Sequence, residues 1–394
     1  MSQREVVVTS GVRTAIGDYG GSLKDIPPTK LGAIVIQEAV SRAKIDPASV
    51  GHVVLGSVIH GEARDMYISR VAAIEAGLPV GTPCLTVNRL CGSGLQAIVS
   101  ASQHILLGDT DVAIGAGAES MSRAAYFMPA ARWGQRMGDA QLIDAMTGAL
   151  HDPFGNGHMG VTAENIAAKY GMNREEQDAF SLESHKRAAK ALDAGWFKSQ
   201  IVPVEVKSKK GPVQFDIDEH VRKDLKIEDL QKLKTVFKKD GTVTAGNASG
   251  LNDAAAAVVL MEKSAAQKQG VKPLARLVAY AHAGVEPQLM GLGPIPAVKR
   301  VFEKSGLKPT DMDVIESNEA FAVQAMAVTR DLGLDPAKVN PNGGAVALGH
   351  PIGATGCVLT VKAIHELHRL QKRYALVTMC IGGGQGIAAI FERM

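Results

Sequence analysis

The most constraining feature of this chain is that it contains one α/β folding unit twice. The segment KIDPASVGHVVLGSV at 44–58 lines up with GLKPTDMDVIESNEA at 306–320, and TVNRLCGSG at 86–94 lines up with KVNPNGGAVALGH at 338–350. Each unit continues with a helical pattern and then a strand that ends in glycines. A repeat of about 120 residues is not the period of a solenoid. We therefore predict two related halves that face each other.

Strand and helix patterns alternate along both halves. Apolar, β-branched runs predict buried strands at 6–9, 53–57, 112–115, 277–280, 314–316 and 375–379. Helical periodicity lies between them, at 30–43, 94–107, 296–305, 320–332 and 355–369. This alternation predicts an α/β protein whose helices cover its sheets.

The middle of the chain, 122–247, has a different character, because it is richer in charge and turn residues. Between 195 and 240 there are eleven Lys and Arg against eight acidic residues, with lysine clusters at 207–210 and 232–239. The lysines form either a solvated surface or a landing patch for a phosphorylated ligand. We expect an inserted domain of helices and loops. The predicted division is 1–121 plus 248–272, then 122–247, then 273–394.

Composition excludes several classes of protein. The net charge is +3, with 46% hydrophobic and 21% charged residues, which argues against a disordered chain and a nucleic-acid binder. No run of 18 apolar residues indicates a membrane span, and the N-terminus lacks a signal pattern, so we expect a cytoplasmic location. Four cysteines without a C-x-x-C pair argue against a disulfide framework and a metal site. The 42 glycines exceed the roughly 28 of average usage and indicate backbone that approaches a ligand closely.

Two cysteines have neighbours that favour chemistry. Cys91 directly precedes a helical run, where the helix dipole favours a thiolate, and Gly92 and Gly94 leave space around it. Cys380 precedes the glycine run 381–386, whose N–H groups could converge on an oxyanion or a phosphate. The alternative for Cys91 is a small residue needed for helix packing. No complete G-x-G-x-x-G supports a dinucleotide site.

Two polar residues complete the candidate set. His350 lies between Gly349 and Pro351 on a loop before a helix, where it could take a proton from a thiol or simply cap the helix. Asn318 ends a buried strand, where its amide could orient a water or bind a carbonyl oxygen. The alternative for Asn318 is an ordinary helix N-cap.

Together these motifs are far more specific than any one alone. NRLCGSG at 88–94, NEAF at 318–321, GGAVALGHPIGATG at 343–356 and CIGGGQG at 380–386 resemble, in this order, the thiolase family. The chain looks most like the biosynthetic branch, the acetyl-CoA acetyltransferases or β-ketothiolases. The resemblance spans essentially the whole chain.

The resemblance implies a fold and a set of roles. The thiolase fold has two βαβαβαββ halves in five α-β-α-β-α layers, with a loop domain inserted in the first. Cys91 would be the acyl-accepting nucleophile, His350 would activate it, and Cys380 would exchange the proton at the α-carbon. Asn318, through a water, and His350 would form one oxyanion hole. The N–H groups of Cys91 and Gly382 would form the other.

The resemblance also implies the reaction and the ligand. The expected reaction is a reversible Claisen condensation of acetyl-CoA with acetyl-CoA or another short acyl-CoA, giving a 3-ketoacyl-CoA by ping-pong kinetics. No tightly bound cofactor is expected. The residues expected to hold coenzyme A and the acyl group are His158, Met159, Arg222, Ser249, Leu251, Met290 and Phe321.

Several alternatives stay open at this point. The nearest is a degradative 3-ketoacyl-CoA thiolase of fatty-acid oxidation, and a β-ketoacyl synthase would normally lack the second thiol at Cys380. A non-catalytic acyl-CoA-binding relative should have lost Cys91, His350 or Cys380. The sequence does not separate polyhydroxyalkanoate-type synthesis from breakdown. The stretch 126–145 resembles a tetramerisation loop, so we expect a homotetramer, with an exposed active-site lid as the alternative.

Overall fold

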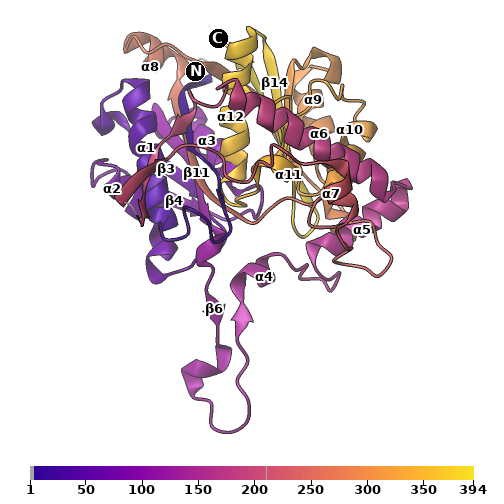
Figure 1. The fold of residues 1–394 in the computed structure, drawn as a ribbon. Coiled ribbons are helices and arrows are strands. Elements are labelled where there is room, and N and C mark those ends of the chain that lie inside the picture. Colours follow the sequence, from indigo (N-terminus) through magenta and orange to yellow (C-terminus); the bar gives the residue numbers. More distant parts are fainter. Residues whose placement is uncertain (1–3, 210) are drawn as a thin grey trace.

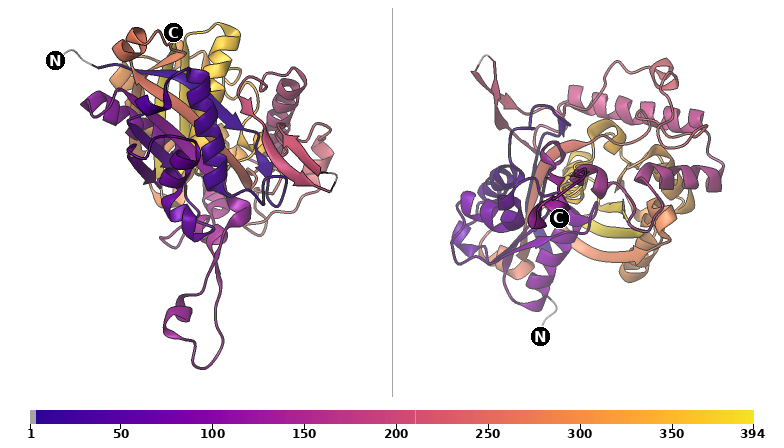
Figure 2. Two further views of the ribbon diagram at one scale, coloured as in Figure 1. Left: turned by 90° about the vertical axis from the view of Figure 1, so that its left-hand side faces the viewer. Right: turned by 90° about the horizontal axis from the view of Figure 1, so that it is seen from below.

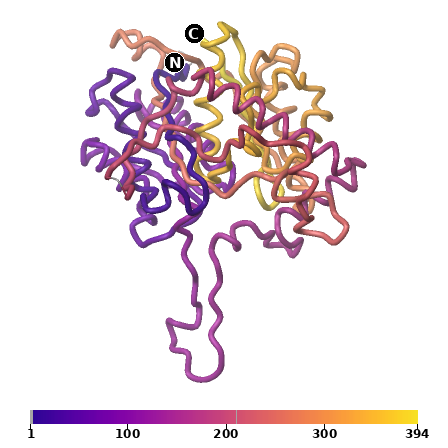
Figure 3. The backbone as a smooth tube through the Cα atoms, in the orientation of Figure 1, coloured from indigo at the N-terminus to yellow at the C-terminus, as the bar shows by residue number. Residues whose placement is uncertain are grey.

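Two copies of one strand-and-helix pattern make up most of the fold, as the duplication predicts. The computed structural model describes residues 4–209 and 211–394, so Lys210 of the first lysine cluster lies outside the described residues. The two copies lie side by side, and the long middle segment crosses over them (Figures 1 and 3). The predicted domain boundaries themselves stay a prediction.

The N-terminal copy follows the order βαβαβαββ. Its elements are β1 (Val6–Thr14), α1 (Pro28–Ala43), β3 (His52–Gly56), α2 (Ile68–Glu75), β4 (Cys84–Val87), α3 (Ser93–Leu107), β5 (Val112–Ser120) and β11 (Asn252–Glu262). The short β2 (Gly17–Asp18) pairs with β11, and α8 (Lys263–Lys268) follows it. Sequence patterns missed β4, a four-residue strand that is only half-buried.

The C-terminal copy repeats this order with one reduction. Its elements are β12 (Ala275–Gly284), α9 (Pro294–Ser305), β13 (Val314–Ser317), α10 (Ala322–Asp331), α11 (Ala345–Leu348), α12 (Thr355–Leu370), β14 (Tyr374–Ile381) and β15 (Gln385–Arg393). The equivalent of β4 is a single parallel bridge between Ile315 and Val339. Sequence patterns missed β15, because the glycines before it were taken as the end of the strand region.

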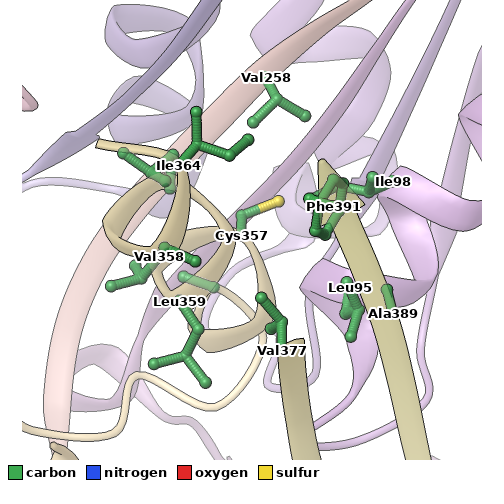
Figure 4. Close-up of a cluster of buried hydrophobic side chains, with 14 of the residues drawn as sticks. Leu95, Ile98, Val258, Cys357, Val358, Leu359, Ile364, Val377, Ala389 and Phe391 are labelled. Atoms are coloured by element: carbon green, nitrogen blue, oxygen red, sulfur yellow. The ribbon is translucent and has the colours of Figure 1, made fainter. Parts of the chain in front are cut away.

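The strands and helices stack in five layers, which confirms the predicted thiolase fold. Hydrogen bonds join the strands in the order β13-β14-β15-β12-β1-β11-β5-β3-β4. Helices α3 and α12 lie between the two copies, where Leu95, Cys357, Val258 and Phe391 meet in one core (Figure 4). Helices α1 and α2 cover the outer face of the N-terminal strands, and α9 and α10 cover that of the C-terminal strands (Figure 1).

Local sequence signals set the ends of the main helices. Helix α9 begins at Pro294, whose missing N–H needs no partner in the first turn, and ends at Gly306 with φ +71°. Helix α3 likewise ends at Gly108, with φ +87°. These signals lie within a few residues of each boundary, which explains why the helices were predictable from sequence.

The inserted segment contains more strand than predicted. Its helices are α4 (Ala145–Ala149), α5 (Met159–Tyr170), α6 (Arg174–Asp193) and α7 (Ile227–Gln231). Its strands are β6 (Tyr126–Phe127), β7 (Ile143–Asp144), β8 (Ile201–Val202), β9 (Val204–Ser208) and β10 (Gly211–Phe215). The expectation of helices and loops alone is therefore wrong. β9 and β10 pair as a hairpin that projects from the body (Figure 2). The exposed β10 has the sequence GPVQF, which begins with glycine and proline and gave no strand signal.

Sequence analysis assigned the excess of glycines to ligand contact. Some of these glycines instead have a structural role. A Cβ at Gly356 in α12 would lie 2.1 Å from the backbone nitrogen of Leu95 in α3. A Cβ at Gly94 would lie 2.7 Å from the backbone nitrogen of Cys357. These glycines let the two central helices touch backbone to backbone, so they serve the seam between the copies.

Candidate active site

The predicted site residues come from distant segments and line one cavity of about 620 Å³. All of them except Asn318 lie on its wall, where the two copies and the inserted segment meet. The lining residues among those predicted are Cys91, His158, Met159, Arg222, Ser249, Leu251, Met290, Phe321, His350, Cys380 and Gly382. Asn318 lies behind this wall and reaches the site through His350.

A strained turn presents Cys91 to the cavity. Leu90 has φ +45°, a left-handed conformation that is uncommon for a branched residue. The Ser93 hydroxyl donates to the Leu90 carbonyl at 2.7 Å and accepts from the Arg89 N–H at 2.9 Å, so it closes the turn. A Cβ at Gly92 would lie 2.6 Å from the end of the Ile381 side chain, so that side chain would have to shift to admit a larger residue beside the nucleophile candidate.

The surroundings keep Cys91 protonated. Burial raises the pKa of its thiol to about 11, although the N–H groups of Gly382 and of Cys91 itself hydrogen-bond the sulfur and oppose the shift. Desolvation outweighs these two N–H groups, so the thiol stays protonated although it directly precedes a helix. A base must accept the proton as the sulfur reacts.

His350 has the protonation state that such a base needs. Its Nδ1 lies 2.7 Å from the Thr355 hydroxyl oxygen, and that hydroxyl donates to the Pro351 carbonyl at 3.0 Å. This arrangement assigns the ring proton to Nδ1 and leaves the Nε2 lone pair as an acceptor. Burial lowers the pKa of His350 to about 4, so the ring is neutral. The backbone N–H of His350 donates to the Asn252 side-chain oxygen at 2.9 Å, and this bond anchors the loop.

Asn318 is part of a buried polar pair and does not cap a helix. Its side-chain Nδ2 lies 3.4 Å from Nε2 of His350, and its backbone N–H donates to the Thr378 carbonyl at 3.0 Å. Helix α10 begins at Ala322 with Phe321 in the cap position, so the N-cap alternative is wrong. Among the described residues, the side-chain oxygen of Asn318 is buried without a hydrogen-bond partner. Such an atom suits an ordered water.

Cys380 is a second buried thiol close to Cys91. It lies near the end of β14 and is 1% exposed. Burial and the neighbouring Cys91 raise the pKa of the Cys380 thiol far above its ordinary value. Two neutral thiols, one neutral imidazole and two backbone N–H groups therefore share one end of the cavity.

The cavity wall also carries an aromatic ring, that of Phe237, which sequence analysis missed. Phe237 stacks on His158 with ring centres 4.6 Å apart and meets Phe321 edge-on at 6.4 Å. His158 also caps α5, since its Nδ1 accepts the Gly160 N–H at 3.0 Å. Phe237 lies inside the lysine cluster 232–239, and its place as an aromatic within a charged run was the one available signal.

Cations gather at the mouth of the same cavity. Arg222 is exposed on the rim, and its backbone N–H donates to Nδ1 of His185 at 3.2 Å. His220, also on the wall, pairs with Asp18. An open hollow bounded by Lys234, Lys238 and Lys239 lies beside Phe237. Lys207 of the first cluster lies on the β9 hairpin and is not among the cavity's wall residues.

Comparisons with known proteins agree with this geometry. The thiolase N-terminal domain family matches residues 6–264, and the thiolase C-terminal domain family matches 271–393. The chain is 68% identical to a β-ketothiolase (BktB) of Cupriavidus necator over 99% of this chain and 100% of that protein. It is 50% identical to an acetyl-CoA acetyltransferase of Chromobacterium violaceum over 99% and 100% of the two chains.

Solved structures give the same result at the level of the fold. A human mitochondrial 3-ketoacyl-CoA thiolase superposes with a TM-score of 0.98 at 45% identity, covering 100% of both chains. A Bacillus anthracis acetyl-CoA acetyltransferase superposes with a TM-score of 0.97 at 45% identity, covering 100% of this chain and 99% of that one. With its duplicated fold, its two thiols and these matches over nearly its whole length, the chain belongs to the thiolase family.

Proposed function

We propose that this protein catalyses the reversible Claisen condensation of acetyl-CoA with acetyl-CoA or another short acyl-CoA, releasing CoA and a 3-ketoacyl-CoA. The observation that carries the proposal is the pair of thiols, Cys91 and Cys380, in one cavity with a neutral His350. One thiol holds an acyl group while the other moves a carbon-bound proton. Either task alone would need only one of them.

The first half-reaction acylates Cys91. Nε2 of His350 takes the thiol proton as the sulfur attacks the thioester carbonyl, and the CoA sulfur leaves with that proton. The N–H groups of Cys91 and Gly382 already converge on the sulfur, so they are placed to stabilise the oxyanion that forms beside it. The high pKa of Cys91 makes transfer to His350 necessary.

The second half-reaction forms the carbon–carbon bond. Nε2 of His350 takes the Cys380 thiol proton, and the Cys380 thiolate removes a proton from the α-carbon of acetyl-CoA. The protonated His350 and a water on the unpartnered side-chain oxygen of Asn318 would stabilise the enolate oxygen. The enolate attacks the acyl group on Cys91, the bond between the acyl carbon and the Cys91 sulfur breaks, and that sulfur takes the proton from His350. In thiolysis Cys380 returns the proton to the departing carbon.

The rest of the cavity suits an extended, anionic thioester. Met159, Ser249, Leu251, Met290 and Phe321 line its wall with largely apolar side chains, and the exposed Arg222 adds a positive charge. His158 and Phe237 add stacked rings along the same wall. A largely apolar cavity beside exposed cationic side chains fits a pantetheine arm that ends in phosphates.

The biosynthetic branch is favoured over a degradative thiolase by sequence similarity. The relatives at 68% and 50% identity are named β-ketothiolase and acetyl-CoA acetyltransferase. The fold itself is neutral, since a 3-ketoacyl-CoA thiolase superposes as well as an acetyltransferase does. A thiolysis assay over 3-ketoacyl-CoA substrates of increasing length tests the branch, and we expect a steep fall beyond short chains. Equal rates with long chains would favour the degradative alternative.

We propose a homotetramer assembled through the segment between β6 and β7. This segment projects from the body (Figures 1 and 3). Separately, no helix among the described residues is both long and apolar enough to span a membrane. Large apolar side chains stand exposed on it, with Tyr126 64%, Trp133 86% and Met137 92% accessible. Exposed apolar surface of this kind marks an interaction site. A cytoplasmic location is part of the same proposal.

Two variants test the division of labour between the thiols. In Cys91→Ser we expect condensation to fall by three or more orders of magnitude, because the acyl group has no thiol acceptor. In Cys380→Ser we expect mass spectrometry to detect acyl-Cys91 after mixing with acetyl-CoA, while condensation is lost. Cys357→Ser, at a buried thiol outside the cavity, is the control and should retain activity. Near-normal turnover by Cys91→Ser would sink the nucleophile assignment.

A further inference from the structure

A buried carboxylate stands one residue after Asn318, outside the active-site cavity. Glu319 is 2% exposed and lies on the wall of a second cavity, of about 570 Å³, bounded by α6 and α10. It therefore does not touch the bound thioester. Its carboxylate accepts three hydrogen bonds, from the Ser184 hydroxyl at 2.7 Å, the Asn340 side-chain amide at 2.8 Å and the Val346 N–H at 3.2 Å.

Two of these donors, on Asn340 and Val346, lie on the segment that leads to His350, and Glu319 itself follows Asn318 in the chain. Asn340 also exchanges two hydrogen bonds with the backbone of Ser317, the residue before Asn318, at 2.9 and 2.8 Å. Val346 lies in α11, four residues before His350. Glu319 thus ties the strand end that carries Asn318 to the loop that carries His350.

A second buried side chain, that of Lys362, links the same strand end to the same loop. Lys362 of α12 donates to Glu316 at 2.7 Å and to the Gly343 carbonyl at 2.8 Å. Gly344 has no room for a side chain, because a Cβ there would lie 2.1 Å from the Glu319 carboxyl carbon. The loop before His350 is therefore held against Glu319 at close range, and small changes in the carboxylate must shift that loop.

We propose that Glu319 is a positioning residue that fixes the separation of Asn318 and His350, and with it the oxyanion hole that these two side chains form. The inference rests on the proposed function. It assigns to Glu319 an effect on the half-reaction that uses this hole, which is condensation. Acylation of Cys91 also needs His350, as its base, but it does not use Asn318 and so does not depend on the separation of the pair. Its oxyanion is held by the N–H groups of Cys91 and Gly382, which lie outside the hydrogen-bond network of Glu319.

The test compares the two half-reactions in Glu319→Gln. The amide keeps one acceptor but turns an N–H₂ group toward donors, so the network must rearrange. We expect steady-state condensation to fall on the order of 10- to 100-fold, and the single-turnover rate of Cys91 acylation to fall by less than about threefold. Equal losses in both half-reactions would overturn the inference.

A double-mutant cycle separates positioning from a general loss of stability. If Glu319 acts through Asn318, Glu319→Gln should lower condensation little further in an Asn318→Ala background. Additive losses would overturn the proposal. Ser184→Ala, which removes one donor, gives a milder variant if Glu319→Gln does not fold, and it should show the same selective loss.

The matched control is Asp65→Asn. Asp65 is a fully buried carboxylate that accepts the N–H groups of Gly61 and Glu62 at 2.8 and 3.0 Å, away from the cavity wall. We expect it to lower the urea midpoint while leaving the ratio of the two half-reaction rates unchanged. If wild-type protein shows no acyl-Cys91 at all, the proposed function fails; if only the selectivity is missing, the positioning role fails.

Discussion

The two copies of the folding unit use the same motif in different ways. In the N-terminal copy, Val87 ends a paired strand, and Asn88 is exposed and accepts one local hydrogen bond, from the Leu90 N–H at 2.9 Å. In the C-terminal copy, Val339 makes a single bridge and Asn340 is buried in a network. The first turn presents a nucleophile candidate, and the second leads to the base candidate.

The difference follows from what covers each edge. Helix α6 of the inserted segment lies on the C-terminal edge, where the Arg187 guanidinium donates to the Val339 carbonyl at 2.8 Å. The β4 edge has no such cover within the described chain, and Leu85 and Val80 are 41% and 80% exposed. The same helix also supports a wall residue of the ligand cavity, because Nδ1 of His185 in α6 accepts the backbone N–H of Arg222. A duplicated unit becomes asymmetric when one helix of an insertion covers the strand edge of only one copy.

The largest expected effect lies at the seam between the copies. Gly356→Ala would place a methyl group 2.1 Å from the Leu95 nitrogen, so α3 and α12 must separate. We expect a loss of about 3 kcal/mol or more in the free energy of unfolding, measured by urea denaturation. Gly81→Ala, where a Cβ meets open space, is the control and should change it by less than about 0.5 kcal/mol. Equal, small effects would mean that the seam is loose.

The next largest difference in stability is expected between alanine variants of the equivalent asparagines, Asn340 and Asn88. Asn340→Ala leaves the backbone of Ser317 and the Glu319 carboxylate without their buried partner, for an expected loss of about 2–3 kcal/mol. Asn88→Ala removes one exposed turn contact and should lower stability by less than about 1 kcal/mol. Urea midpoints of both variants measure the contrast. Equal losses would contradict the asymmetry of the two turns.

Acid should act mainly on the C-terminal copy. Burial lowers the pKa of His282, His350 and His365 to about 4, below the 6.5 of the unfolded chain. The unfolded state then binds more protons between these values, so stability is full above about pH 6.5 and falls as the pH drops toward 4. Between pH 7 and pH 5, the free energy of unfolding of His365→Gln should fall by up to about 2 kcal/mol less than that of the wild-type protein. An unchanged pH slope would show that His365 is not held neutral.

The smallest effect on stability is expected in the projecting segment. Trp133→Ser replaces a side chain that is 86% exposed, so the free energy of unfolding should change by less than about 0.5 kcal/mol. If this segment assembles tetramers, light scattering should show a shift toward smaller species. A variant that keeps the wild-type mass would remove Trp133 from the proposed contact.

Much of the site was predictable because its residues stand in local motifs. Cys91 before α3, His350 between glycine and proline, and the glycines after Cys380 are each recognisable within a few residues of sequence. Phe237 was missed because it lies in a lysine run, and Glu319 because its partners are up to 135 residues away in the chain. No local pattern carries information about contacts at that separation.

The sequence by itself determined the duplicated α/β architecture and the residue types that carry the chemistry, because both are written in short-range periodicity and in motifs. Only the tertiary structure decided how those residues behave. The helix terminus alone favours a Cys91 thiolate, yet burial raises its pKa to about 11 and makes a base necessary. It also decided which copy α6 covers and which glycines serve the seam. Desolvation and close packing depend on neighbours that are distant in the chain, so these properties exist only in the folded protein.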